Sequence, residues 1–309
     1  MINQNNILLL GSSGFVGCRV KNIFKKNNID IFSPKKIELN LANYSQIKRY
    51  LIKNKISHII NCAGKVGGIL DNSQNQLEFY RVNNEINYNL ITAAHKAGIN
   101  NFLNLSSSCM YPDHYTTKMK ENKLMTGRLE RTNLGYSIAK LSAAYYIKLI
   151  KDKDNLNYSN LIPCNLYGPY DNFHEKNSHL LASIIRKVIN AKKNCDKSIE
   201  VWGDGKPRRE FLFVDDLANF IFLIIKKKYI LPPFLNVGYG KDYSVKNFYK
   251  IVMKICNYNV KLNYDLTKPN GIKRKLIDSS VAKNKYNFKV STSLENGVKK
   301  TIKYYENTF

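Results

Sequence analysis

Tyr136 and Lys140 stand four residues apart in the segment YSIAK, a spacing that places them on one face of a helix, one turn apart. An ammonium group close to a phenol favours the phenolate and lowers the pKa of the tyrosine. Ser107, in the segment LSSSCMYP (residues 105–112), adds a hydroxyl that can donate to a carbonyl oxygen. Together these three side chains predict a site that moves a proton to or from the oxygen of a ketone or an alcohol.

Cys109, two residues after Ser107, is the unusual member of this set. A thiolate can take a proton from carbon, so a cysteine here suggests a second proton transfer besides the one at oxygen. The alternative is a cysteine that packs as a small apolar side chain. Its place beside Ser107, at the predicted end of a strand, favours a functional role.

A glycine-rich turn, GSSGFVG, precedes these segments. It follows the apolar residues 7–10 directly and leads into a predicted helix that ends near Lys26. Such a turn lets backbone amides and a helix N-terminus approach a pyrophosphate group. The spacing is GxxGxxG rather than GxGxxG, and its place after the first strand carries the prediction. The predicted cofactor-binding residues of this turn are Gly11, Ser12, Ser13, Gly14, Phe15, Val16 and Gly17.

The end of the second predicted strand, residues 30–33, indicates which dinucleotide binds. NAD sites place an acidic residue there, whereas this chain continues with Lys35 and Lys36. Asp30 lies at the start of the strand, too early for this role. Basic residues suit a 2′-phosphate, so the sequence predicts NADPH, with Lys35 or Lys36 at that phosphate.

Strands and helices alternate along the first half of the chain. Strands are expected over 7–10, 30–33, 58–64 and 101–108, and helices over 45–54, 79–98 and 136–151. This order predicts an α/β fold with a doubly wound, parallel Rossmann sheet. Residues 1–165 are expected to form the NADP-binding domain, joined by parts of 208–240. Residues 166–309, beginning with a helix over 174–193, are expected to form a smaller, interleaved substrate lobe.

The composition narrows the class of protein further. The 309 residues include 49 basic and 23 acidic side chains, a net charge of +26. The lysines are spread along the whole chain and no nucleic-acid motif accompanies them, so we expect a polyanionic ligand such as a nucleotide diphosphate, and no nucleic acid. Six scattered cysteines predict free thiols and no metal site. The N-terminus has no signal-peptide pattern and no apolar run spans a membrane, so a cytoplasmic location away from the membrane is expected.

Several further segments carry a resemblance to a known family. The glycine turn, the serine strand end and YSIAK resemble the extended short-chain dehydrogenase/reductase family, in particular its enzymes that act on GDP-4-keto-6-deoxy sugars. Ser12 and Ser13 depart from that pattern, which has a basic residue in the turn. The other matching segments are AGKVGGI (63–69), PCNLYGPYDNF (163–173), NSHLLASIIRK (177–187) and VWGDGKPRREFLFVDDLA (201–218).

The resemblance implies an NADPH-dependent C4 reductase with coupled 3,5-epimerisation, in the synthesis of surface-polysaccharide sugars. Tyr136 would donate the proton, supported by Lys140 and Ser107, while Cys109 and His179 would be the base and acid of the epimerisation. A homodimer through the helices at 79–98 and 136–151 is also implied. Besides the turn, the implied cofactor residues are Leu105, Ser106, Lys140, Pro163, Asn165 and Leu166, and the implied GDP-binding residues are Lys187, Trp202 and Arg209.

Several alternatives stay open from the sequence alone. The chain could be a reductase of a GDP-4-keto-heptose or related sugar that does not epimerise, or a dinucleotide-binding protein without catalytic activity. His179 could cap a helix, and Trp202 could be a core aromatic side chain. Asp215 and Asp216 are expected to cap the next helix rather than take part in chemistry.

Overall fold

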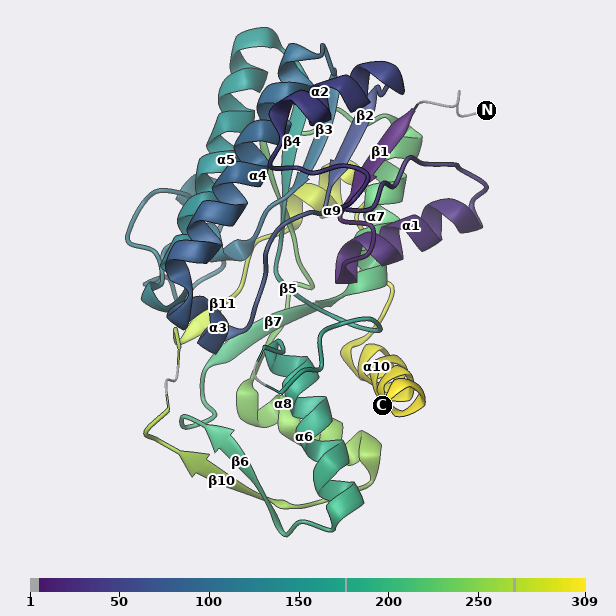
Figure 1. Cartoon of the computed structure of the whole chain (residues 1–309). Coiled ribbons are helices and arrows are strands. Elements are labelled where there is room, and N and C mark those ends of the chain that lie inside the picture. The colour runs from purple at the N-terminus through teal and green to yellow at the C-terminus, as the bar shows by residue number, and fades with distance from the viewer. Residues whose placement is uncertain (1–5, 176, 269–270) are drawn as a thin grey trace.

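The computed structural model describes residues 6–175, 177–268 and 271–309, and Figure 1 shows their arrangement. A sheet of five parallel strands lies in the upper part of the molecule, in the order β1-β2-β3-β4-β8. Its strands are β1 (Ile7–Leu10), β2 (His58–Asn61), β3 (Asn101–Leu105), β4 (Asn157–Pro163) and β8 (Phe234–Val237).

Helices cover both faces of this sheet. One layer packs around Leu51, Ile91 and Ile147, and the other around Phe24, Leu217 and Ile221. The first layer consists of α2 (Tyr44–Lys53), α4 (Gln76–Lys96) and α5 (Leu134–Asp154), and the second of α1 (Phe15–Lys26), α7 (Val214–Lys227) and α9 (Ser280–Tyr286). The predicted α/β, doubly wound parallel fold is therefore confirmed.

A smaller unit lies below the large sheet in Figure 1. Its helices α6, α8 and α10 surround a separate cluster of buried side chains that includes Leu181, Phe248 and Val298. It consists of β5 (Asn165–Tyr167), α6 (Leu180–Asn194), β6 (Ser198–Trp202), β7 (Arg208–Phe213), β9 (Asp242–Ser244), α8 (Val245–Cys256), β10 (Lys261–Asp265), β11 (Arg274–Lys275) and α10 (Leu294–Thr308).

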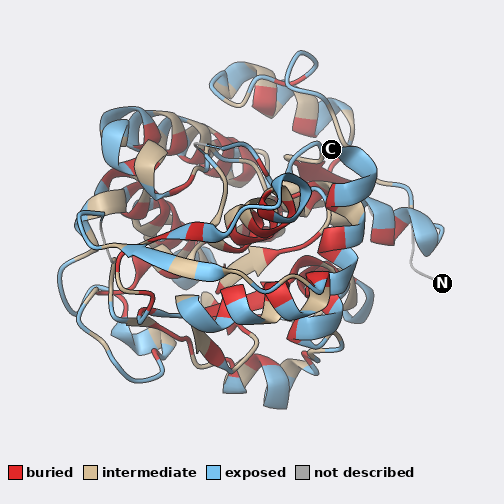
Figure 2. Ribbon diagram, turned by 90° about the horizontal axis from the view of Figure 1, so that it is seen from below, coloured by how far each residue is buried: buried red, intermediate tan, exposed pale blue. Residues whose placement is uncertain are grey.

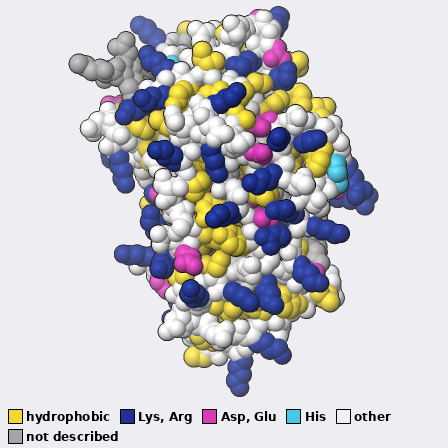
Figure 3. Space-filling view, turned by 180° about the vertical axis from the view of Figure 1, so that it is seen from behind, with side chains coloured by type: hydrophobic (Ala, Val, Ile, Leu, Met, Phe, Trp, Pro, Cys, Tyr) yellow, Lys and Arg dark blue, Asp and Glu magenta, His cyan; other side chains and the backbone are white. Residues whose placement is uncertain are grey.

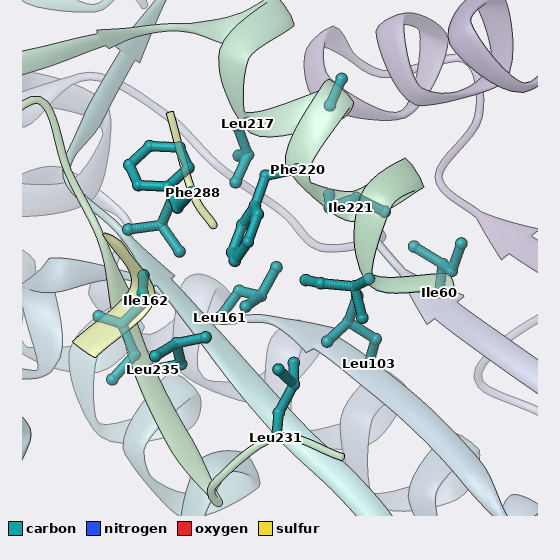
Figure 4. Close-up of a cluster of buried hydrophobic side chains, with 14 of the residues drawn as sticks. Ile60, Leu103, Leu161, Ile162, Leu217, Phe220, Ile221, Leu231, Leu235 and Phe288 are labelled. Atoms are coloured by element: carbon teal, nitrogen blue, oxygen red, sulfur yellow. The ribbon is translucent and has the colours of Figure 1, made fainter. Parts of the chain in front are cut away.

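Strand β7 joins the two cores. Phe211 and Phe213 pack into the lower cluster, while Leu212 between them packs into the upper one. Successive side chains of a strand point to opposite faces, so one strand serves both clusters. Figure 4 shows the upper cluster, where Leu103 and Leu161 from the sheet face Phe220 and Ile221 of α7. Figure 2 shows that, across the whole molecule, buried residues lie on the inward faces of the helices and strands and exposed residues lie on the outside.

A row of buried asparagines crosses the large sheet. Asn61 on β2 donates to Asn104 on β3 at 2.9 Å, and Asn104 donates to Asn160 on β4 at 3.0 Å. Ser106 donates to Asn160 as well, and Asn160 donates to the Ala144 carbonyl of α5 at 3.1 Å. Each of these amides is fully buried and hydrogen-bonded, so the row fixes the strand ends and α5 relative to one another.

Three local predictions differ from the structure. The expected strand at 30–33 is a single bridge, in which Phe32 pairs in parallel with Leu8. The helix expected from residue 174 begins only at Leu180. Asp215 and Asp216 do not cap α7, because Asp215 accepts two hydrogen bonds from Arg19 and Asp216 accepts from Thr292.

Two short turns of 3-10 helix complete the region around the predicted site. They are η1 (Ser108–Met110), which follows β3, and η3 (Arg131–Asn133), which leads into α5. All six cysteines are free thiols, as predicted. No helix in the described part of the chain is long and apolar enough to span a membrane.

Candidate active site

The glycine turn lies between β1 and α1 and has the backbone geometry that a pyrophosphate requires. Gly11 adopts a positive φ of 74°, and a Cβ at Gly17 would stand 2.1 Å from the Gly11 carbonyl oxygen, so neither position has room for a side chain. No side-chain hydrogen bond caps the N-terminus of α1. The amides of Phe15, Val16 and Gly17 begin that helix, so the turn fits a dinucleotide.

Lys35 and Lys36 lie in an exposed segment just beyond Phe32. Phe32 runs parallel to β1, so this segment leaves the sheet at the edge where the glycine turn lies. Their placement fits the predicted contact with a 2′-phosphate. Three other predicted cofactor residues lie at strand ends of the large sheet: Leu105 ends β3, Ser106 follows it, and Pro163 ends β4. Asn165 and Leu166, also predicted, lie just beyond β4 in β5, which belongs to the second sheet.

Lys140 and the end of β3 hold the predicted catalytic set together. Lys140 is buried, and its ammonium donates to the carbonyl oxygen of Leu105 at 3.0 Å. The same ammonium lies 5.8 Å from the centre of the Tyr136 ring. Burial lowers the pKa of Lys140 to about 8, so the group remains mostly charged at neutral pH.

Tyr136 is hydrogen-bonded to Ser107 and keeps its proton. Burial raises the pKa of the phenol, the nearby Cys109 sulfur raises it further, and the hydrogen bond with Ser107 opposes both. The prediction that this pKa is lowered is therefore wrong, because desolvation outweighs the stabilisation of the phenolate. The consequence is a neutral phenol, which is the form that a proton donor needs.

Cys109 lies in η1, and two nitrogen donors approach its sulfur. The side-chain amide of Asn133 donates to it at 3.2 Å, and the ammonium of Lys275 donates at 3.3 Å. Ser107 is the N-cap of this turn and accepts the Cys109 amide at 3.2 Å. Sequence reasoning missed Asn133 and Lys275. Lys275 lies 166 residues from Cys109, and no spacing rule connects them.

His179 lies just before α6 and is paired with an acidic side chain. Its Nδ1 lies 2.9 Å from the buried carboxylate of Asp171. Burial alone lowers the pKa of the imidazole, but the hydrogen bond and the charge of Asp171 outweigh it and raise that pKa. Asp171 was also missed, although it belongs to the segment PCNLYGPYDNF and precedes His179 by eight residues.

A loop of residues 64–68 lies between His179 and the site formed by Ser107, Tyr136 and Lys140. A Cβ at Gly64 would meet the ammonium of Lys140 at 3.5 Å, and one at Gly68 would meet the Ser178 carbonyl at 2.8 Å. The structure thus places His179 across this loop from Lys140. Within the described ranges, no hydrogen bond joins His179 to Cys109 directly.

The residues predicted to bind GDP fall into two places. The ammonium of Lys187 lies 5.7 Å from the centre of the Trp202 ring, at one end of the smaller unit. Trp202 is half-buried and donates to Glu200, so it is not a core side chain. Arg209 lies nearer the cysteine: it donates to the Ile272 carbonyl at 2.7 Å, and its charge interacts with Cys109.

A nucleotide turn joined to a Ser–Tyr–Lys set at the same sheet edge defines the class of dinucleotide-dependent oxidoreductases. Residues 7–238 match the model of the NAD dependent epimerase/dehydratase family, and the chain belongs to that family. The predicted family is thereby confirmed.

Individual relatives match over nearly the whole chain. A GDP-L-colitose synthase of Yersinia pseudotuberculosis is 40% identical, over 97% of this chain and 98% of its own. A GDP-L-fucose synthase of Azorhizobium caulinodans is 34% identical, over 97% and 96% respectively. The solved structure of MlghC, a GDP-mannoheptose C4 reductase from Campylobacter jejuni with NADP bound, shares the fold, with a TM-score of 0.86, 24% identity and coverage of 99% and 100%.

The Asp171–His179 pair leads to a prediction about proton affinity. Replacing Asp171 with Asn removes the charge that favours the imidazolium, so the pKa of His179 should fall and the imidazole should lose its proton at lower pH. NMR titration of the histidine ring protons would measure this, with the His179 signal assigned from a His179→Gln variant.

Asp154→Asn is the matched control, because Asp154 is the acidic partner of His95, at 2.7 Å. That change should leave the His179 titration where it was. An unchanged titration of His179 in Asp171→Asn would show that the carboxylate does not set the charge of the imidazole.

Proposed function

We propose that the chain reduces the C4 ketone of a GDP-4-keto-6-deoxy sugar with NADPH and also inverts carbons 3 and 5, in the synthesis of a surface-polysaccharide sugar. The observation that carries the proposal is the joining of Ser107, Cys109, Tyr136 and Lys140 at the carboxyl end of β3. The enzyme class is that of an NADPH-dependent nucleotide-sugar oxidoreductase. Bound NADPH supplies the hydride.

Tyr136, Ser107 and Lys140 account for the reduction. Hydrogen bonds from the Tyr136 and Ser107 hydroxyls to the ketone oxygen would polarise the carbonyl group. Once hydride has reduced the carbon, that oxygen needs a proton. The neutral phenol of Tyr136 can give that proton. The phenolate left behind is stabilised by the ammonium of Lys140, whose position is fixed by the Leu105 carbonyl.

Cys109 and His179 account for the epimerisation. The C4 ketone acidifies the hydrogens on carbons 3 and 5, so a thiolate can remove one while donors at the ketone oxygen stabilise the enolate. Delivery of a proton to the opposite face of the carbon inverts it. His179 suits that step, because Asp171 favours its protonated form.

Basic and aromatic side chains suit the GDP moiety. Lys187 and Arg209 offer charges for a pyrophosphate, and Trp202 offers a half-buried ring for a base. The GDP-L-colitose synthase and the GDP-L-fucose synthase named above are both more than 30% identical to this chain, and their GDP-sugar names support GDP as the nucleotide. Figure 3 shows lysine and arginine side chains scattered over a whole face with few acidic ones, a surface that attracts an anionic substrate.

The outer faces of α4 and α5 support a homodimer. They expose a group of large apolar side chains, which a second copy would cover: Leu77, Tyr80 and Tyr88 of α4, and Leu134, Ile138 and Leu149 of α5. We expect light scattering coupled to gel filtration to give twice the chain mass of 35.6 kDa. A monomer mass at working concentrations would reject the dimer.

Two variants should separate the two halves of the reaction. In heavy water with GDP-4-keto-6-deoxymannose and NADPH, Tyr136→Phe should lose at least about a hundredfold in reduction while deuterium still enters the sugar. Cys109→Ser should lose deuterium incorporation at carbons 3 and 5 and retain NADPH oxidation. Product NMR and absorbance of NADPH would measure both.

Undiminished NADPH oxidation by Tyr136→Phe would refute the assigned proton donor. Reduction by the wild-type protein without deuterium at either carbon would instead identify a reductase that does not epimerise. Lys148→Met, which alters an exposed pair with Asp152 on the outer part of α5, serves as the surface control and should change neither rate.

A further inference from the structure

Lys275 is a buried lysine to which the proposed function gives no role. It is 8% exposed and lies in β11, which pairs in parallel with β7 so that Lys275 stands beside Arg209. Its neighbour Arg274 points to the other side of the strand, where it donates to Asp242 at 2.7 Å. The alternation of side chains along a strand therefore turns Lys275 toward Cys109, whose sulfur lies 3.3 Å from its ammonium.

In the described part of the chain, no carboxylate forms an ion pair with Lys275. Its ammonium has one hydrogen-bond acceptor there, the Cys109 sulfur. Removing an ammonium from water is costly unless an anion or a strong acceptor replaces the water. An ionised sulfur meets that need, and a neutral thiol meets it poorly.

The second donor to the sulfur, the side-chain amide of Asn133, also favours an ionised sulfur. The Asn133 amide nitrogen donates to Cys109 at 3.2 Å, and the oxygen of the same amide accepts from the Ser137 hydroxyl at 3.0 Å. The bond to Ser137 fixes which end of the amide faces the sulfur. Two donors directed at one sulfur favour its anionic form, because hydrogen bonds to the charged form stabilise it.

The other charged and titratable groups that act on Cys109 come from two elements. Arg209 on β7 and Lys140 on α5 are cations, and Tyr136 on α5 is a phenol that keeps its proton. Cys109 is therefore surrounded by three cations. Lys275 is the one that is both buried and in direct contact with the sulfur.

We propose that Lys275 is a positioning residue that keeps Cys109 as a thiolate, ready to take a proton from carbon. What the thiolate then does rests on the proposed function. It takes the hydrogen of carbon 3 or 5 as a proton, the C–H electron pair passes into the enolate, and the His179 imidazolium returns a proton from the other face. Exchange with water then removes the proton from the Cys109 thiol and returns a proton to the His179 imidazole. Lys275 stays charged throughout.

The test measures the thiolate directly and needs no substrate. Alkylation of each cysteine by iodoacetamide, followed by mass spectrometry across a range of pH, reports the fraction of Cys109 that is ionised. In Lys275→Met the rate at Cys109 should fall by at least about tenfold at neutral pH, and its pH profile should move to higher pH. Lys275→Arg should restore most of the rate, because it restores the charge.

Three controls separate this role from a loss of structure. Cys195, which is exposed, should keep its pH profile in every variant. Lys283→Met removes an exposed lysine bonded to the Tyr239 carbonyl, and it should leave Cys109 unchanged. If Lys275→Met fails to bind NADPH, Asn133→Ala takes its place, and its Cys109 profile should move in the same direction.

A wild-type Cys109 that is alkylated with the same pH profile as Cys195 would overturn the inference whatever the substrate is. So would a profile that Lys275→Met, folded and able to bind NADPH, leaves unmoved. If the profile moves as expected but no deuterium enters the sugar, the thiolate inference stands and the epimerase half of the proposed function fails.

Discussion

The site depends on one hydrogen bond, from the ammonium of the buried Lys140 to the carbonyl oxygen of Leu105. It ties α5, which carries Tyr136, to the end of β3, from which Ser107 and Cys109 follow. The row of buried asparagines also connects β3 with α5, because Asn160 is hydrogen-bonded both to Asn104 of β3 and to the backbone of α5. Groups from distant parts of the chain therefore meet in a fixed arrangement, which a proton-transfer site requires.

Tyr136 and Cys109 lie in opposite electrostatic environments. The phenol of Tyr136 keeps its proton because desolvation disfavours the phenolate, so the residue is a donor at rest. The sulfur of Cys109, in contrast, is approached by Lys275 and Asn133, which favour an anion. In the proposed reaction, a proton donor to oxygen and a proton acceptor from carbon would therefore stand side by side without neutralising each other, because each has its own environment.

The sequence predicted the parts of the site that local spacing encodes. The glycine turn, the pairing of Tyr136 with Lys140 and the place of Ser107 after a strand all follow from short segments whose geometry is fixed by one helix or one strand end. Lys275 could not be predicted, because its approach to Cys109 depends on how β11 pairs with β7. The pKa of Tyr136 was predicted in the wrong direction, since proximity to Lys140 can be read from spacing but burial cannot. The fold class followed from the alternation of strands and helices, while Phe32 shows that a short strand can be reduced to a single bridge.

If one site both inverts and reduces a GDP-4-keto sugar, a single incubation of the wild-type protein can show both reactions. The protein would be mixed with NADPH and, in turn, GDP-4-keto-6-deoxymannose and a GDP-4-keto-heptose in heavy water, and each product analysed by NMR. We expect a reduced C4 together with deuterium and inverted configuration at carbons 3 and 5 of the 6-deoxy sugar. A product reduced at C4 with no deuterium at either carbon, from either substrate, would contradict it.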